Sequence, residues 1–385
     1  MSGPVAVVAL SNRDAISTAD AGVRPAAAVA TSSASSQVAV RAEPGRSTRD
    51  VPLNAPVNIA VERGSIQSVS VAPKGGRALS GEIDPAGTSW RSSATLDPAA
   101  TYVVEVVAKG TGGEVQHHLS TFSTLTPKYK LYASISPGGT VGVGMPVVVS
   151  FDAPVTDRAA VQKRLSMTMS TPVEGAWSWM GNREVHFRPK NYWPVGEQVT
   201  VSADLAGLDA GGNVWGFGSA KTSFTVGNSH ISTVDANAHT MTVSVNGSVA
   251  RVMPASTGRE KYPTMSGVHI AQYKTADVIM DSATTGIPRN DPDGYYEHVA
   301  WNVAITDGGE FVHAAPWSVA DQGRRNVSHG CVNLADDQAK WFYDLTLPGD
   351  IIQVVGTPRP ASLSDGGTVD WNTSWSAWVK GDALA

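Results

Sequence analysis

Short stretches of alternating apolar and polar residues begin near Val51, separated by turns that contain Gly, Pro and Asp. The alternation is clear at 57–61, 68–71 and 102–107. A period of two places every second side chain on the same face of a strand, so each stretch predicts a strand with one buried face. Strands of this length and spacing predict an immunoglobulin-like β-sandwich over residues 49–126.

The next block follows the same plan. Apolar stretches at 147–151 and 198–202 predict strands, and the turn residues 209–212 precede a final stretch that ends at Val226. The two blocks end alike, with a strand, a Gly-rich turn and a further strand. We therefore predict a second immunoglobulin-like domain over residues 127–228.

A third block covers residues 229–357 and is also rich in strand patterns. The stretch 240–245 alternates and is followed by Asn246-Gly247, the strongest hairpin signal in the chain. More strands are expected after it, and 350–355 ends the block. This block is predicted to be a mainly β domain.

Neither end of the chain follows these patterns. Residues 1–48 are rich in Ala, Ser, Val and Arg without a sustained period, which predicts a disordered tether or the remnant of an export region. Within them, the apolar stretch 5–10 is too short for a signal peptide and no basic residue precedes it. No cysteine for lipid attachment lies near the start.

At the other end, residues 358–385 form a tail that opens with Pro and Gly. Trp371, Trp375 and Trp378 would share one face of a short helix, with Asp370 as its N-cap and Gly381 at its end. We predict that this face packs on the preceding domains. A platform on which carbohydrate stacks is the alternative.

The composition agrees with these strand patterns. The chain has 385 residues, of which 42% are hydrophobic and 16% charged, and it carries 38 Gly. The length suggests two or three domains at roughly 150 residues each, and the composition favours an all-β fold. A net charge of −5 gives no basic surface for nucleic acid. No apolar run approaches the roughly 18 residues of a membrane-spanning helix.

The chemistry is concentrated around Cys331, the only cysteine. A thiol attacks as the thiolate, and a nearby imidazole can take its proton. His313, at the end of an apolar stretch, is the candidate base. No acidic residue adjoins it, so the backbone carbonyl of Ala314 is the candidate group that orients its ring.

The segment Ser328-His329-Gly330-Cys331 supplies the other parts of such a site. A Gly beside the nucleophile lets successive backbone N–H groups aim at one point, so the N–H groups of His329, Gly330 and Cys331 are candidate oxyanion donors. His329 is a second candidate base, but we favour a role in holding this loop. A zinc site of His313, His329 and Cys331 lacks the usual ligand spacing, and we expect no metal or cofactor.

His313, fourteen intervening residues and the motif Ser328-His329-Gly330-Cys331-Val332-Asn333 together resemble the signature of L,D-transpeptidases of the YkuD fold. Two immunoglobulin-like domains before such a domain, and a Trp-bearing tail after it, resemble the mycobacterial and related actinobacterial branch. The similarity extends to further segments of the third block: Met280-Asp281-Ser282, Gly294-Tyr295, 311–318 and Trp341-Phe342-Tyr343-Asp344.

The resemblance implies an enzyme of the cell envelope that acts outside the cytoplasm. Cys331 would attack the bond between meso-diaminopimelate and D-Ala in a stem tetrapeptide of peptidoglycan, release D-Ala and form a thioester. The side-chain amine of a second stem's diaminopimelate would resolve it, so that two third residues become cross-linked. Carbapenems would acylate the same cysteine.

The resemblance also assigns residues around the nucleophile. Tyr295 matches a lid tyrosine near the oxyanion, and we expect residues 282–299 to form a flexible lid. One departure is Ala314, where relatives would have Ser; it is harmless only if this residue acts through its carbonyl. The remaining matched positions line the donor pocket or flank the nucleophile: Met280, Trp317, Ser328 and Asn333.

Two other functions remain open from the sequence. An L,D-carboxypeptidase would form the same thioester and pass it to water. A non-catalytic wall-binding protein built from immunoglobulin-like modules would form no thioester. Product analysis separates the first from a transpeptidase, and covalent labelling of Cys331 separates the second.

Overall fold

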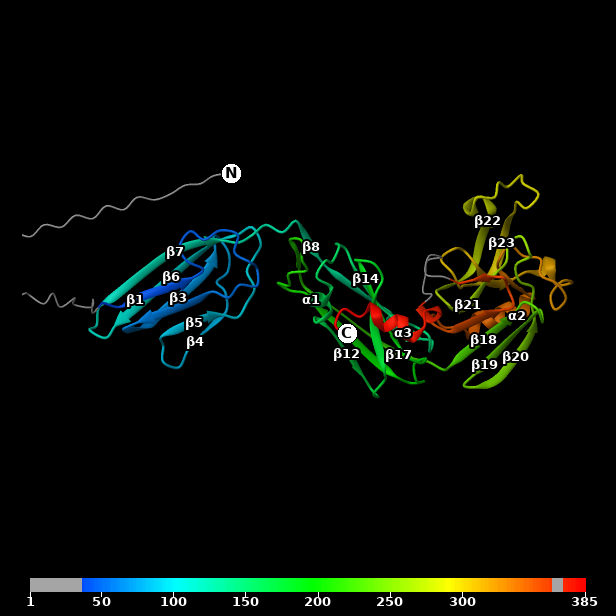
Figure 1. Ribbon diagram of the computed structural model, residues 1–385, viewed down its shortest axis with the longest axis horizontal. Coiled ribbons are helices and arrows are strands. Elements are labelled where there is room, and N and C mark those ends of the chain that lie inside the picture. The colour runs from blue at the N-terminus through cyan, green and yellow to red at the C-terminus, as the bar shows by residue number, and fades with distance from the viewer. Residues whose placement is uncertain (1–36, 362–369) are drawn as a thin grey trace, which may run out of the picture.

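A computed structural model describes residues 37–361 and 370–385. Strands dominate it and its helices are short, so the prediction of an all-β fold is confirmed. Three β-rich bodies follow one another along the long axis of the molecule, and the C-terminal segment lies beside the second and third (Figure 1). No helix in the described ranges is long and apolar enough to cross a lipid bilayer.

The first body is a sandwich of two antiparallel sheets, in which alternate side chains of the central strand Thr101–Gly110 are buried. At its centre the rings of Tyr102 and Phe122 stack at 5.1 Å. One sheet has the order β1 (Ala39–Glu43), β2 (Asn58–Glu62), β5 (Ser89–Ser92), β4 (Gly81–Ile83), and the other has the order β3 (Gly64–Pro73), β6 (Thr101–Gly110), β7 (Val115–Ser123).

Strand β1 corrects the prediction that residues 1–48 lack structure. Ala39–Glu43 pairs antiparallel with β2, and Val38 just before it is buried in the first core. The stretch 38–43 does alternate, but it is too short to stand out from the Ala- and Ser-rich sequence before it. Pairing with β2 and burial of Val38 stabilise this short stretch as a strand. Residues 1–36 lie outside the described part of the chain.

The second body is also a sandwich, with aromatic residues packed between its sheets. The ring centroid of Phe187 lies 5.4 Å from that of Trp177 and 5.9 Å from that of Trp193. The strands, in spatial order, are β13 (Gly175–Trp179), β14 (Glu184–Pro189), β11 (Val147–Phe151), β9 (Ala133–Ser136) in one sheet and β10 (Gly139–Val141), β17 (Ser219–Val226), β15 (Gln198–Asp204), β12 (Leu165–Met169) in the other, with the pair β8 (Tyr129–Leu131), β16 (Val214–Gly216) and helix α1 (Arg158–Gln162) beside them.

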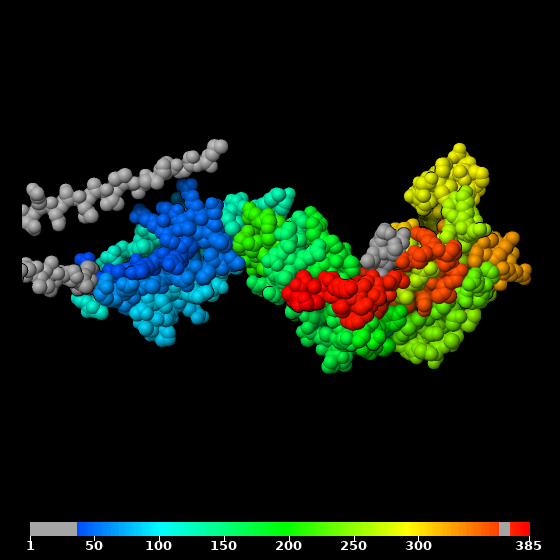
Figure 2. All heavy atoms as spheres, in the orientation of Figure 1, coloured from blue at the N-terminus to red at the C-terminus, as the bar shows by residue number. Residues whose placement is uncertain are grey.

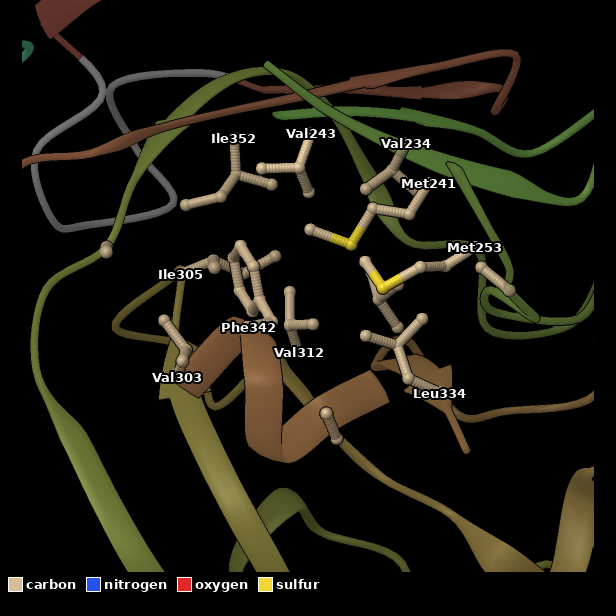
Figure 3. Close-up of a cluster of buried hydrophobic side chains, with 14 of the residues drawn as sticks. Val234, Met241, Val243, Met253, Val303, Ile305, Val312, Leu334, Phe342 and Ile352 are labelled. Carbon is tan, nitrogen blue, oxygen red and sulfur yellow. The ribbon is translucent and has the colours of Figure 1, made fainter. Parts of the chain in front are cut away.

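The third body consists of a six-stranded and a four-stranded sheet with helix α2 (Asp336–Leu345). Figure 3 shows Phe342 of α2 pointing into the core between Ile305, Val312 and Ile352. The six strands are β20 (Ser248–Pro254), β19 (Thr240–Val245), β18 (His230–Asp235), β26 (Ile351–Val355), β21 (Met265–Ile270), β27 (Arg359–Pro360), and the four are β22 (Lys274–Asp281), β23 (Tyr296–Ala304), β24 (Phe311–Ala314), β25 (Val332–Leu334).

Two features of the four-stranded sheet determine where the candidate site residues lie. Strands β24 and β25 are parallel, and their register puts His313 beside Asn333. Strands β22 and β23 form a hairpin that projects from the body, with the short helix η1 (Ser282–Thr285) at its end (Figure 1). The segment predicted to be a lid is therefore the tip of a long hairpin.

The C-terminal segment lies across the second and third bodies (Figure 2). The indole N–H of Trp378 donates to the carbonyl of Ala176 in the second body at 2.9 Å. The side-chain amide of Asn372 donates to the carbonyl of Val268 in β21 of the third body at 2.7 Å. Trp378 is buried, so it is not an exposed surface for carbohydrate. The guanidinium of Arg188 lies over the rings of all three tail tryptophans.

The tail is not the single helix that its Trp spacing predicts. It contains η4 (Asp370–Asn372), α3 (Trp375–Trp378) and η5 (Val379–Gly381), and Ser374 rather than Asp370 caps α3. Asp370 is buried and its carboxylate lies 2.9 Å from Nδ1 of His186. The Asp370 carboxylate, which the sequence predicted to cap a helix, is instead paired with His186 from the second sandwich.

Candidate active site

A cavity of about 200 Å³ lies beside Cys331, at the start of β25 and below the β22–β23 hairpin. Ala314 and Gly330 were expected to contribute backbone atoms only, and every other site residue expected from the sequence lines this cavity. The full lining is Met280, Tyr295, Glu297, His313, Trp317, Ser318, Asp321, Val327, Ser328, His329, Cys331 and Asn333.

The imidazole of His313 is buried at the end of β24 and is held by one hydrogen bond. Its Nδ1–H donates to the carbonyl of Ala314 at 2.8 Å, which leaves Nε2 as the nitrogen that can accept a proton. Burial lowers the pKa of His313 to about 4. The ring is therefore neutral near pH 7, as a general base has to be.

The thiol of Cys331 is neutral as well. Burial raises its pKa to about 12, the nearby backbone of Phe311 opposes the shift, and the charge of Glu310 adds to it. The thiol's hydrogen-bond partner in the described part of the chain is the carbonyl of Gly309, at 3.9 Å. Attack on a substrate thus requires the thiol proton to leave as the new bond forms.

The loop before Cys331 is a tight turn held by Ser328. The Ser328 hydroxyl accepts a hydrogen bond from the N–H of Gly330 at 3.1 Å and donates to the carbonyl of Cys331 at 2.6 Å. Gly330 has a φ of 132°, and a Cβ there would lie 3.2 Å from a carboxylate oxygen of Glu310, so the position requires Gly.

This turn corrects one expectation about the oxyanion donors. Three successive N–H groups were expected to face one point, but in this state the N–H of Gly330 is bound to Ser328. The short polar side chain competes for a nearby backbone donor, as Ser commonly does in turns. The N–H groups of His329 and Cys331 remain as candidates.

His329 lies beside the cavity but accepts a hydrogen bond on the nitrogen that a base would use. Nη2 of Arg259 donates to its Nε2 at 2.8 Å. Because a guanidinium can only donate, this Nε2 carries no proton. Burial lowers the pKa of His329, and the charge of Arg259 lowers it further. The geometry matches the loop-holding role that we favoured for His329.

Asn333 presents an unpaired acceptor beside the cavity. Its Nδ2 donates to the hydroxyl of Ser318 at 3.0 Å, which fixes the orientation of the amide. Within the described residues its Oδ1 is buried without a hydrogen-bond partner. A buried unpaired carbonyl oxygen is costly, so a bound ligand with an N–H group would satisfy it.

The hairpin supplies the opposite wall. The backbone N–H of Tyr295 donates to the hydroxyl of Ser282 at 3.0 Å, and the Tyr295 ring lies 4.9 Å from that of His329. Burial raises the pKa of Tyr295, so it remains a phenol that can donate. Met280 and Glu297 are paired across β22 and β23, one pair before the ladder ends at the hairpin tip.

The sequence analysis missed several residues of this site. Burial raises the pKa of Glu297, which lies in the cavity two residues after Tyr295, and alternation along the strand could have found it. No sequence signal marks Ser318 or Asp321. Trp317 was expected, and its half-exposed ring stacks on His313 with centroids 6.0 Å apart.

A neutral imidazole with a fixed tautomer and a lone cysteine on a Gly turn share one small cavity in a β domain. Together these features define a cysteine acyltransferase. Residues 229–355 match the L,D-transpeptidase catalytic domain family (YkuD), and residues 48–209 match the bacterial Ig domain family. The chain belongs to the L,D-transpeptidase family, and the resemblance inferred from the sequence is confirmed.

Relatives of known name agree over most of the chain. L,D-transpeptidase 2 of Mycobacterium tuberculosis is 39% identical over 87% of this chain and 82% of its own. L,D-transpeptidase 5 of the same species is 31% identical over 89% of this chain and 76% of its own. The solved structure of the LD transpeptidase LdtMt1 in complex with imipenem is 41% identical, covers 60% of this chain and 100% of that chain, and has a TM-score of 0.52.

As a member of this family, the chain is a cysteine-dependent peptidoglycan transpeptidase. The family acts on the cell wall, so its place of action is outside the cytoplasm.

Proposed function

We propose that Cys331 is the nucleophile in a two-step acyl transfer between peptidoglycan stem peptides. Its sulfur attacks the carbonyl of the bond between meso-diaminopimelate and D-Ala while the thiol proton passes to Nε2 of His313. His313 returns that proton to the departing D-Ala amine, which leaves a thioester on Cys331.

The side-chain amine of a second stem's diaminopimelate then attacks the thioester carbonyl. The amine gives up a proton through His313, the carbon–sulfur bond breaks, and the thiol is restored. The product is an amide between the third residues of the two stems. The cycle consumes no other reactant, and neither metal nor cofactor enters it.

The observation that carries this proposal is the hydrogen bond from Nδ1 of His313 to the carbonyl of Ala314. It fixes the tautomer in which Nε2 can receive a proton, and it does so without a carboxylate. Since a backbone carbonyl is the acceptor, the Ala in place of the expected Ser leaves this function intact. Both His313 and Cys331 line the same cavity.

The cavity walls suggest how the donor stem binds. Met280 and Trp317 give apolar surfaces, and the buried Oδ1 of Asn333 can accept an N–H from the stem backbone. The oxyanion would be stabilised by the N–H groups of His329 and Cys331 and by the phenol of Tyr295. Ser328 shapes this turn through its two hydrogen bonds.

We also propose that the two sandwiches, over residues 49–126 and 127–228, act as spacers for the catalytic domain at 229–357. The linear arrangement in Figure 1 supports this proposal, because it separates the cavity from the N-terminal end of the described chain. Residues 358–385 would then brace the catalytic domain against the second sandwich.

The solved relative in complex with imipenem suggests the test. We expect intact-protein mass spectrometry to find a covalent imipenem adduct on the wild type and none on Cys331→Ala. A wild type that forms no adduct would overturn the proposed nucleophile and favour a wall-binding protein. Incubation with stem tetrapeptide then separates the enzymes: cross-linked dimer supports the transpeptidase, and released tripeptide alone supports a carboxypeptidase.

A further inference from the structure

The segment 257–264 lies between the nucleophile turn and the tip of the β22–β23 hairpin, and it joins them. Its backbone is bound to the turn on both sides of Gly258: the N–H of Ser328 donates to the carbonyl of Thr257 at 3.1 Å, and the N–H of Arg259 donates to the carbonyl of Ser328 at 3.0 Å. Arg259 therefore starts from a backbone position that is fixed relative to Cys331.

The guanidinium of Arg259 contacts both the turn and the hairpin. Nη1 donates to the carbonyl of Val327 at 3.4 Å, and Nη2 donates to Nε2 of His329 at 2.8 Å and to Oδ1 of Asp293 at 2.5 Å. Val327 and His329 belong to the nucleophile turn, whereas Asp293 lies at the hairpin tip, two residues before Tyr295. Arg259 and Asp293 are each less than one-third exposed.

The Asp293 carboxylate accepts hydrogen bonds from Arg259 and from two further residues of the segment 257–264. Its other oxygen accepts from Nζ of Lys261 at 2.5 Å and from the hydroxyl of Tyr262 at 3.0 Å. Lys261, Tyr262 and Arg259 all lower the pKa of Asp293, so the carboxylate remains charged in neutral and mildly acidic solution. We call Arg259, Lys261, Tyr262, Asp293 and His329 the Arg259 cluster.

We propose that Arg259 is a positioning residue for acyl transfer: it holds the hairpin tip and the nucleophile turn in one register and keeps Nε2 of His329 unprotonated. This inference rests on the proposed role of Cys331. Arg259 does not itself line the cavity, but it contacts Val327 and His329, which do. Its effect therefore passes through Tyr295 and through the turn that carries His329 and Cys331.

The geometry explains why an arginine serves here. A planar guanidinium presents five donors in a fixed fork, and this one reaches three acceptors in different directions. A lysine would keep the charge but would offer one point of attachment. If Arg259 acted only through its charge, Arg259→Lys would keep the wild-type acylation rate. If Arg259 positions the hairpin tip and the turn, Arg259→Lys should slow acylation.

A second consequence concerns the protonation of His329. The groups that face its ring are Arg259, Lys261 and Tyr262 from one segment, Asp293 and Tyr295 from the hairpin, and Cys331 from its own turn. Without Arg259 the nearest cation is gone and Asp293 remains. His329 would then take up a proton at a higher pH and place a positive charge beside the oxyanion donors.

The test compares the rate of Cys331 acylation by imipenem in four variants of the full chain: Arg259→Met, Arg259→Lys, Asp293→Asn and Arg289→Met. Arg289→Met is the matched control, because Arg289 forms an ion pair with Asp281 in the same hairpin but is exposed and does not touch His329. We expect Arg289→Met to stay within about twofold of the wild type, as for an exposed pair.

Arg259→Met should acylate at least about tenfold more slowly, and Arg259→Lys and Asp293→Asn severalfold more slowly. The double variant Arg259→Met/Asp293→Asn should lose less than the product of the two single losses, since both substitutions remove the Arg259–Asp293 contact. The pH profile of Arg259→Met should gain an ionisation from His329 at a higher pH than in the wild type, because a cation that lowers the pKa of His329 is gone. A role in stability alone would not create that ionisation.

Two results would overturn the inference: an Arg259→Met rate within twofold of Arg289→Met, or a tenfold loss without a changed pH profile. If circular dichroism shows that Arg259→Met does not fold, the isosteric variant Asp293→Asn serves as the test instead. An Asp293→Asn acylation rate within twofold of Arg289→Met would then overturn the inference. Failure of the proposed function is distinguishable, because then the wild type itself would form no adduct.

Discussion

At the scale of single residues, burial sets the resting state of the site. It raises the pKa of Cys331 to about 12 and lowers that of His313 to about 4, so both groups are neutral between these values. Burial disfavours the charged form of each group, and the two shifts therefore have opposite signs.

This resting state predicts an unusual pH profile. The acylation rate with imipenem should rise as His313 loses its proton near pH 4 and should then stay flat from about pH 5 to about pH 10. Stopped-flow kinetics over this range provides the measurement. An acid limb centred near pH 6.5 would contradict it, since that is the ordinary value for an exposed histidine.

At the scale of elements, the β22–β23 hairpin determines access to the nucleophile. Its strands bear Met280 and Glu297 next to the tip, and the tip bears Tyr295, so one element supplies a whole wall of the cavity. The tip is held by side-chain contacts to other segments rather than by ladder hydrogen bonds. Such a segment opens at a lower free energy than the core does.

Removing the tip should slow the chemistry and spare the fold. We expect a chain in which residues 283–295 are replaced by a short Gly-containing turn to acylate about tenfold to a hundredfold more slowly, because the wall and Tyr295 are lost. Its melting temperature should stay close to that of the wild type, since the tip contributes little to the core. An unaltered acylation rate would show that the hairpin tip is not a functional lid.

At the scale of the whole molecule, the C-terminal tail links the second sandwich to the catalytic domain. A buried ion pair between His186 of β14 and Asp370 of the tail lies at this junction. Burial by itself lowers the pKa of His186, but the hydrogen bond to Asp370 and the carboxylate of Glu184, 3.5 Å from Nε2, outweigh it and raise the pKa to about 9. The imidazole is therefore charged near pH 7, unlike that of His313.

The stability of this junction should depend on pH. An unfolded histidine has a pKa of about 6.5, so the contribution of His186, up to about 3 kcal/mol, is fully present below pH 6.5 and is lost as the pH rises through about 9. The difference in melting temperature between the wild type and His186→Asn should shrink over this window. His298→Asn, at an exposed pair, is the control, and a constant difference would contradict the prediction.

The strand patterns, the hairpin signals and the cysteine motif are local, and the sequence by itself determined them. A period of two follows from strand geometry, and the turn around Gly330 needs a glycine wherever it lies. These signals were enough to predict the β fold, the nucleophile, the base and the Ala314 carbonyl as the group that holds it. They also predicted a lid at residues 282–299, which form the end of the β22–β23 hairpin.

Only the tertiary structure decided which distant segments meet. Arg259 lies 34 residues before Asp293 and 70 before His329, and no periodicity links them. The same is true of His186 and Asp370, which the sequence separates by 184 residues. The sequence predicted a helix cap for Asp370 and no role for His186. Two buried histidines thus differ in pKa by several units, because burial and partners come from packing and not from the residue type.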